Sequence, residues 1–233
     1  MDFTPKLDQI RRNTSQIHNL LRDARLVVCF GNRALLCTFV GGLIGQDHLV
    51  GAATCEAAGL ALVEQHQPSM VVLSDTLEEG SGVALVQAIK QRWPTIHTLL
   101  LISQEQRQEA IKSAIEAGCD GLLVVSRMGL GSSLAAIHAI SGGGVYVDRS
   151  LAELFRRGHG DGGPLEPLSE RERQVLSLVA RGDSNGEIGQ QLYVSADTVK
   201  THLRHLCRKL PARDRTHAAV LGLRWGLIDW PEA

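Results

Sequence analysis

The chain has 233 residues, a length that fits one or two domains, and its 24 Lys/Arg and 25 Asp/Glu leave a formal net charge of −1 that indicates no partner by itself. Hydrophobic residues make up 44% and aromatic residues only 4%, which is typical of an aliphatic α/β protein. The lack of an apolar run of about 18 residues argues against a membrane-spanning helix. The charged first residues do not resemble a signal peptide, so we expect a cytoplasmic protein. The five cysteines form no CxxC pair, which argues against a disulfide framework or a zinc site.

Residues 1–24 are predicted to form a short amphipathic helix. Thr4 and Pro5 suit the cap and the first position of a helix. Apolar residues then recur at helical spacing on one stripe, namely Leu7, Ile10, Ile17 and Leu21. Two interpretations remain open: the stripe packs on its own domain, or these side chains form a dimerisation surface.

Residues 25–155 alternate between short apolar runs and helical patterns. The runs predicted to be buried strands are 26–30, 49–54, 70–73, 99–102 and 122–125. Stretches 82–92 and 105–117 show helical spacing. The alternation predicts an α/β domain with a flavodoxin-like, doubly wound, parallel five-stranded sheet and helices on both faces. Ligands of such domains bind at the carboxyl ends of the strands.

A stretch rich in glycine and proline, residues 156–167, separates this domain from the remainder. Such a composition sustains neither a helix nor a strand. We therefore expect a flexible linker between two domains.

Residues 168–233 are predicted to form a second, all-α domain of four helices. Ser169 with Glu172 three residues later is a capping box that begins its first helix, which ends near Gly182. Two further helices are expected at 185–192 and 196–210, and Ser195 can cap the latter.

The helix at 196–210 combines an apolar face with a basic flank. The apolar residues recur at spacings of 4, 3 and 4, namely Val199, Leu203, Leu206 and Leu210. Basic residues dominate the stretch that follows Thr198, namely Lys200, Arg204, Arg208, Lys209, Arg213 and Arg215. Two short helices joined by a brief turn, with a basic second helix, suit insertion into the major groove of double-stranded DNA. An ordinary amphipathic helix with a solvated charged face fits the periodicity equally well.

Segment 168–228 resembles the four-helix LuxR-type domain of NarL/FixJ regulators, and this resemblance favours the DNA-binding interpretation. The matching residues are Glu172, Leu176, Gly182, Ser184, Asn185, Glu187, Ile188, Leu192, Thr198, Val199, Lys200, His202, Lys209, Leu210, Arg215 and Thr216. The resemblance implies that the third helix enters the major groove. The DNA-binding candidates are Ser184, Asn185, Ser195, Thr198, Val199, Lys200, His202, Arg204, Arg208 and Lys209.

Two positions depart from the LuxR-type pattern, and the resemblance also suggests a dimer contact. Gly186 stands where the family usually has a long polar side chain, and Pro211 replaces the usual glycine, so we expect a different turn into the fourth helix. The fourth helix often dimerises in this family, which makes Ala218, Leu221 and Trp225 dimerisation candidates.

Residues 25–150 resemble the receiver domain of response regulators, in which an acidic pair, a phosphorylated Asp, a Thr/Ser and a Lys form a Mg²⁺-dependent phosphorylation site. In this chain those five positions fall on Gly31, Asn32, Ser74, Ser103 and Val125. Only Ser103 keeps the type of residue that the family has. Asp75 follows Ser74 directly and is expected in the same degenerate pocket, but without the acidic pair and the Lys we expect no phosphorylation.

We therefore expect a transcription regulator that binds DNA as a homodimer and whose receiver-like domain works by dimerisation or by binding a regulatory protein or small ligand. Two alternatives stay open: an interaction adaptor with secondary DNA binding, and a two-component switch phosphorylated on Asp75. No GxSxG, HExxH or Walker pattern occurs, so we expect neither an enzyme nor a cofactor. His202, His205 and Cys207 do not share one helix face, so we expect no metal site.

Overall fold

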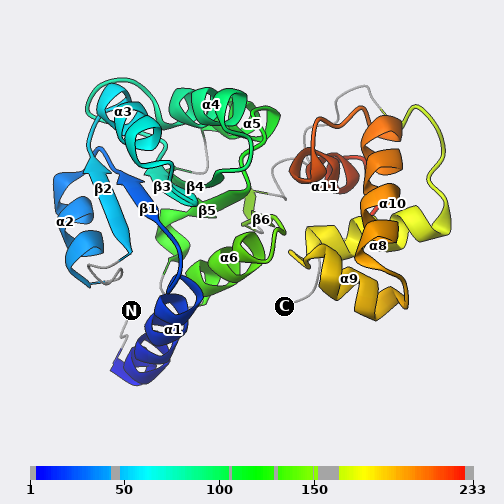
Figure 1. Cartoon of the computed structure of the whole chain (residues 1–233), viewed down its shortest axis with the longest axis horizontal. Helices are drawn as coiled ribbons and strands as arrows, with labels where there is room; N and C mark the ends of the chain where they lie inside the picture. Colours follow the sequence, from blue (N-terminus) through cyan, green and yellow to red (C-terminus); the bar gives the residue numbers. More distant parts are fainter. Residues whose placement is uncertain are drawn as a thin grey trace. The chain divides into compact units, whose positions relative to one another are not determined.

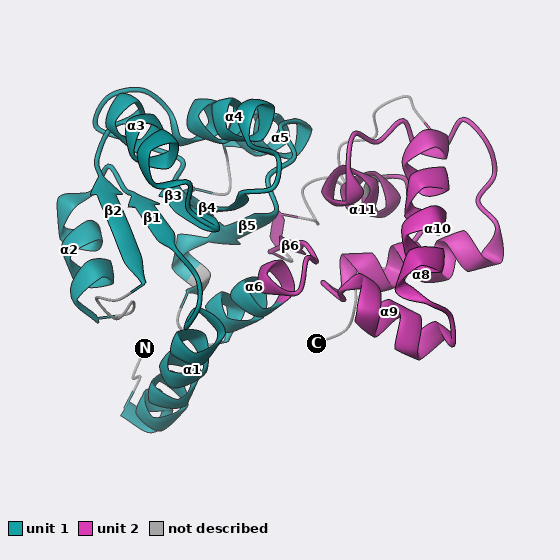
Figure 2. Cartoon of the chain, viewed as in Figure 1, with its two compact units in different colours: residues 1–138 teal, residues 139–233 magenta. Residues whose placement is uncertain are grey.

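The computed structural model describes residues 4–42, 48–104, 107–128, 131–148, 150–151 and 163–228. The chain divides into two compact units, residues 1–138 and 139–233 (Figure 2). The division falls within a helix rather than at the expected linker. Residues 156–162 of that linker lie outside the described residues, so its bounds stay a prediction.

A six-stranded sheet forms the centre of the α/β part (Figure 1). Its strands are β1 (Leu26–Cys29), β2 (Leu49–Ala53), β3 (Met70–Ser74), β4 (His97–Ile102), β5 (Gly121–Val124) and β6 (Tyr146–Val147). Their order is β2-β1-β3-β4-β5-β6, and β1 to β5 pair in parallel. The predicted parallel, doubly wound α/β fold is confirmed.

Helices cover both faces of this sheet, as strand–helix alternation requires. One face carries α3 (Glu56–His66), α4 (Gly82–Arg92) and α5 (Gln108–Glu116) (Figure 1). The other carries α1 (Leu7–Leu20), α2 (Arg33–Gly42) and α6 (Ser132–Ser141), and side chains from these three helices line a small apolar cavity over β3, β4 and β5. A 3-10 turn, η1 (Thr4–Lys6), precedes α1, in agreement with the predicted helix start.

The sequence patterns located the strands to within two residues and the helix at 82–92 without error. They missed β6, because two residues are too few for an alternation signal. Val125 was expected at the end of a strand but begins a 3-10 turn, η2 (Val125–Arg127), so β5 begins and ends one residue earlier than predicted.

Within the described residues 163–228, the helices are α8 (Glu170–Ala180), α9 (Asn185–Leu192), α10 (Ala196–Lys209) and α11 (Arg215–Arg224). Both capping boxes, Ser169 with Glu172 and Ser184 with Glu187, are closed. The helices bury a shared core that includes Val175, Leu176, Val179, Ile188, Val199, Leu203, Leu206, Leu210 and Ala218. Within the described residues, no helix has the length and apolar character that crossing a membrane requires.

Candidate functional site

Helix α10 carries the candidate site, and its own residues fix its ends and its orientation. Ser195 caps the N-terminus, where its side chain accepts a hydrogen bond from Thr198 N at 3.1 Å. Asp197 in the first turn and Arg208 in the last turn complement the helix dipole. Val199 and Leu206 are fully buried in the bundle core, so the opposite face of the helix points to solvent.

The outward face of α10 presents hydrogen-bond donors and positive charge. Its exposed polar and charged residues are Asp197, Thr198, Lys200, Thr201, Arg204, His205 and Arg208, and we call this set the α10 outer face. Lys200 Nζ lies 3.2 Å from Asp197 Oδ1, a solvent-exposed pair one turn apart that holds Lys200 only weakly. His202 is half-buried at the border of this face. The α10 outer face therefore consists of hydrogen-bond donors with one acidic residue, Asp197, near its N-terminal end.

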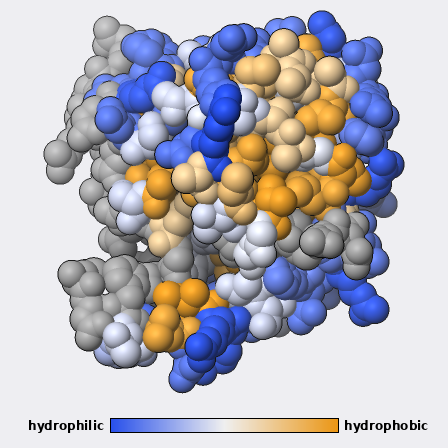
Figure 3. All heavy atoms as spheres, turned by 90° about the vertical axis from the view of Figure 1, so that its left-hand side faces the viewer, coloured by the Kyte–Doolittle hydropathy of each residue, from blue (hydrophilic) through white to orange (hydrophobic). Residues whose placement is uncertain are grey.

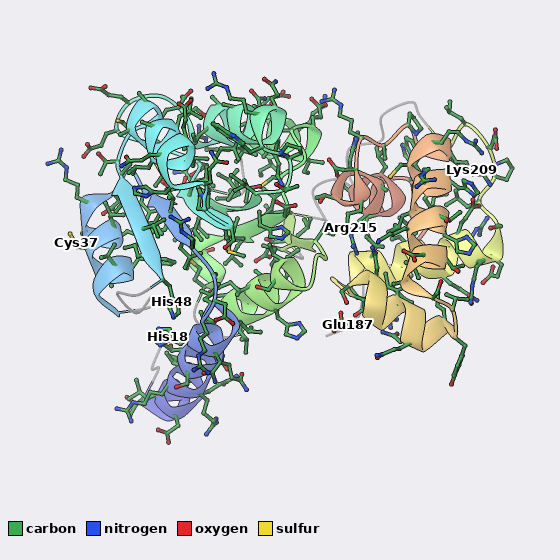
Figure 4. The ribbon with its side chains drawn as sticks, viewed as in Figure 1. His18, Cys37, His48, Glu187, Lys209 and Arg215 are labelled. Atoms are coloured by element: carbon green, nitrogen blue, oxygen red, sulfur yellow. The ribbon has the colours of Figure 1, made fainter. Side chains whose placement is uncertain are left out.

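Two of the sequence candidates on α10 point elsewhere. Val199 is 0% exposed and packs in the core, so it cannot both support the bundle and reach an external partner. Lys209 lies at the C-terminal end of α10 (Figure 4), where its Nζ donates to Glu172 Oε2 at 2.8 Å and to Pro167 O at 3.2 Å. Lys209 is therefore a structural residue that ties α10 to the start of α8.

The ion pair between Lys209 and Glu172 is largely shielded from solvent. Their side chains are 16% and 5% exposed. Burial by itself raises the pKa of Glu172, but the hydrogen bonds from Lys209 and Ser169 outweigh burial and leave that pKa below its ordinary value. The carboxylate thus remains charged and joins the α8 N-terminus to α10, while Lys209 also binds the preceding Pro167 O.

Three further candidates serve as helix-terminal groups. Ser184 accepts from Glu187 N as the cap of α9, and Ser195 caps α10. Asn185 Oδ1 accepts a hydrogen bond from Arg215 Nη1 at 3.2 Å, and Arg215 Nη2 also donates to Asp183 O at 2.8 Å. Arg215, at the start of α11 (Figure 4), therefore fixes the turn that leads into α9.

The DNA-binding candidates chosen from the sequence leave out Thr201 and Tyr193, which the geometry brings into the site. Thr201 lies near the centre of the α10 outer face, one turn beyond Asp197 and one turn before Arg204 and His205. Tyr193 joins α9 to α10 in a left-handed conformation (φ 56°), with 95% of its surface exposed. Helical spacing from the buried Val199 could have identified Thr201, whereas no local pattern sets the exposure of Tyr193.

The dimerisation candidates divide by burial. Ile17 and Leu21 are 4% and 2% exposed and line the cavity over the sheet, so in this chain they pack on their own domain. Ala218 and Leu221 belong to the helical core, and Trp225 packs against it. Leu7 is 45% exposed and Ile10 is half-buried, which leaves the first turns of α1 as the accessible part of the stripe.

At the four receiver-like positions that lack the family's type of residue, the residues present serve the local fold instead. A Cβ atom on Gly31 would lie 2.6 Å from Thr76 O, so no acidic side chain fits there. Asn32 Oδ1 accepts from Leu35 N at the start of α2, and Ser74 Oγ accepts from Gly31 N at 3.1 Å and donates to Thr76 O. Val125 is half-buried and carries no charge.

Asp75 lies beside these positions with its side chain 0% exposed. Its carboxylate accepts hydrogen bonds from Ser103 N at 3.2 Å, Ser103 Oγ at 3.1 Å and Arg107 Nη1 at 3.0 Å. Thr76 Oγ1 lies 3.5 Å from the same group. The sequence analysis placed Asp75 and Ser103 in one pocket, and the structure brings them together with Arg107, which that analysis did not name.

Comparison with known proteins agrees with this architecture. A family model of bacterial regulatory proteins, the luxR family, matches residues 166–221. The DNA-binding transcriptional activator DevR/DosR of Mycobacterium tuberculosis is 31% identical over 184 residues, which cover 76% of this chain and 84% of the relative. The chain belongs to the luxR family of response regulators. A nitrate/nitrite response regulator homolog of Haemophilus influenzae, also 31% identical, covers 86% of this luxR-family chain and is itself matched over 97% of its length.

A solved structure of RcsB shares the fold. A structure described as two RcsB dimers bound to two parallel DNAs has a TM-score of 0.50 and 15% identity, and the match covers 86% of this chain and 98% of that one. At this identity the likeness concerns the fold alone.

Proposed function

We propose that this luxR-family chain is a sequence-specific, DNA-binding transcription regulator whose receiver-like domain acts without phosphorylation. The observation that carries the first half is the α10 outer face: a capped helix with one face buried in a bundle and the other lined with Lys200, Arg204 and Arg208. A major groove admits one helix, and its flanking phosphates attract basic side chains.

The relatives support this assignment by what their names state. DevR/DosR of Mycobacterium tuberculosis is a DNA-binding transcriptional activator, and the RcsB structure contains dimers on DNA. We assign base-edge contacts to Lys200, Thr201 and Arg204, because the helix that enters a groove reads bases with its outward side chains near its N-terminal half. We assign phosphate contacts to Arg208 and Tyr193, which flank that stretch.

The test compares DNA binding of the full-length, unphosphorylated chain with that of Arg204→Gln at two salt concentrations, on a site selected from random DNA. We expect Arg204→Gln to weaken binding by about 1–3 kcal/mol and to relax preference at one base position. Lys112→Gln on α5, which removes an exposed positive charge outside the helical bundle, is the matched control and should bind like the parent. Equal losses for both variants would contradict the assignment.

The second half of the proposal rests on the occupation of the receiver-like pocket. Gly31 leaves no room for an acidic side chain, and the Asp75 carboxylate is buried against Ser103 and Arg107. A phosphodonor with Mg²⁺ should therefore add no mass to the chain. A mass gain that disappears in Asp75→Asn would instead establish a phosphorylated switch.

We further propose that the α/β domain contributes to a homodimer. Half-buried apolar residues, namely Leu35, Leu36, Val40, Leu49 and Val50, lie on α2 and on β2, the first strand in the sheet order. Figure 3 shows apolar side chains gathered on this side of the molecule. A charge placed on an edge strand opposes association, so Val50→Lys should shift the sedimenting species toward monomer while Lys112→Gln does not.

A further inference from the structure

Asp75 is held in a donor set that is complete without any external group. The carboxylate takes a main-chain N–H and a hydroxyl from Ser103, a guanidinium N–H from Arg107, and lies within 3.5 Å of Thr76 Oγ1. Its backbone is fixed on both sides, because Asp75 N donates to Leu101 O at 2.9 Å and Gly82 N donates to Asp75 O at 3.2 Å. The side chain therefore emerges from the end of β3 in one direction.

The donors belong to a different part of the fold from the carboxylate. Ser103 directly follows β4 and Arg107 directly precedes α5, so the two residues delimit the connection between these elements. Main-chain N–H groups, hydroxyls and guanidinium groups are the donors that proteins use for small oxyanions. Arg107 is 38% exposed and Ser103 is exposed, so the donor set faces the surface while the carboxylate fills its interior.

We propose that Ser103 and Arg107 form a binding site for a small carboxylate, and that Asp75 is its tethered, permanent occupant. Because the occupant is covalently attached, its effective concentration exceeds that of any free anion, and the site stays filled without a signal. Ser103 and Arg107 are then held in one arrangement against Asp75. This inference deepens the phosphorylation-independent part of the proposed function, because it names the group that takes the place of a signal-dependent anion.

The test empties the site and refills it from solution. Asp75→Ala removes a carboxylate the size of formate and leaves the Ser103 and Arg107 donors without their acceptor. In the full-length chain we expect a fall in the melting temperature of the α/β domain of roughly 5–10 °C. Sodium formate should restore part of that fall with a saturable dose dependence, whereas sodium chloride at equal ionic strength should not.

Controls make the formate effect specific to the site. Asp75→Asn keeps the space filled and should not respond to formate beyond the chloride control. The parent chain should not respond either, because its site is occupied. Combining Asp75→Ala with Arg107→Gln should remove the formate effect. Equal responses to formate and chloride in Asp75→Ala, or an equal formate response in the parent, would overturn the proposal.

A second measurement covers the case in which Asp75→Ala does not fold. Arg107→Gln keeps the carboxylate in place and removes one charged donor, so hydrogen exchange at Ser103 N should become at least several-fold faster. Unchanged exchange would overturn the proposal. None of these readouts involves DNA, so a failure here is distinguishable from a failure of the DNA-binding assignment.

Discussion

The α10 outer face and the receiver-like pocket contain similar side chains in opposite circumstances. On α10, Lys200, Arg204 and Arg208 are exposed, and the ion pair between Lys200 and Asp197 is open to solvent. In the pocket, Arg107 is matched by a carboxylate that is 0% exposed. The donors of a surface that binds a polyanion are hydrated when no polyanion is bound. The donors of the pocket already bond to an internal carboxylate, so the pocket needs no external ligand.

The contrast recurs within α10 itself, between two neighbouring basic residues. Arg208 belongs to the exposed face, whereas Lys209 is 16% exposed and bound to Glu172. Both residues are basic and they are adjacent in the sequence, so neither property explains why their environments differ. Their roles differ because consecutive residues on a helix point about 100° apart, so one faces solvent and the other the α8 N-terminus.

Replacing these neighbours in turn should give the largest effects. Lys209→Met leaves the Glu172 carboxylate buried without its cation, so we expect the helical bundle to lose about 3–5 kcal/mol of unfolding free energy. Arg208→Gln should change stability by less than about 0.5 kcal/mol. Denaturant unfolding of the full-length chain, monitored on the helical signal, gives both values.

DNA binding should show the reverse order. Where both variants are folded, Arg208→Gln should reduce the steepness of the salt dependence by about one unit of slope, because one phosphate contact is lost, and Lys209→Met should leave it unchanged. If Lys209→Met also reduced the slope of the salt dependence, Lys209 would have to be a DNA-contacting residue.

The same ion pair predicts how stability depends on pH. The pKa of Glu172 is lower in the folded chain than its ordinary value of 4.5, because its hydrogen bonds outweigh burial. The ordinary value of about 4.5 represents the pKa of Glu172 in the unfolded chain. The stability that the charged Glu172 carboxylate contributes is therefore fully present above about pH 4.5 and disappears as the pH falls through the lower pKa of the folded chain. We expect Glu172→Gln to be less stable than the parent at pH 7 and the gap to narrow below about pH 4.5. A gap that stays constant between pH 7 and pH 3.5 would contradict this account.

Sequence reasoning found the elements and the outer face of α10 because both depend on local patterns. Capping signals at Ser169 and Ser195 and the spacing of Val199 and Leu206 set helix bounds and buried faces before any tertiary contact is considered. It could not distinguish Lys209 from Arg208, because the partner of Lys209 lies 37 residues away. The pocket partner Arg107 was missed for the same reason, since the approach of β3 to the β4–α5 connection is a tertiary event.

Gly31 and Asn32 stand at the two positions of the receiver's acidic pair, and the sequence pattern does not distinguish them. Replacing each with aspartate should nevertheless have different effects on stability. A side chain on Gly31 meets backbone atoms of Thr76 and Leu77 within 2.8 Å, which cannot yield as a flexible side chain would. Gly31→Asp should therefore cost about 3 kcal/mol or more. Asn32→Asp retains a side-chain acceptor for Leu35 N at the start of α2 and should stay within about 0.5 kcal/mol of the parent. Thermal unfolding of the two variants checks this order, and a tolerated Gly31→Asp would show that the loop can open to admit the family's acidic residue.

The smallest expected effect concerns Ser195, which was predicted both to cap α10 and to contact DNA. Ser195→Ala removes the acceptor for Thr198 N and should cost about 1 kcal/mol of unfolding free energy with little change in DNA affinity. Ser195→Asp keeps the cap and suits the helix dipole, so the fold should be as stable as the parent. A carboxylate at the groove-facing end of α10 would nevertheless repel phosphates, so DNA affinity should fall at low salt and recover partly at high salt. Parent-like binding by Ser195→Asp at low salt would show that the N-terminus of α10 points away from the DNA, because a helix end that enters the groove cannot carry an added negative charge without loss.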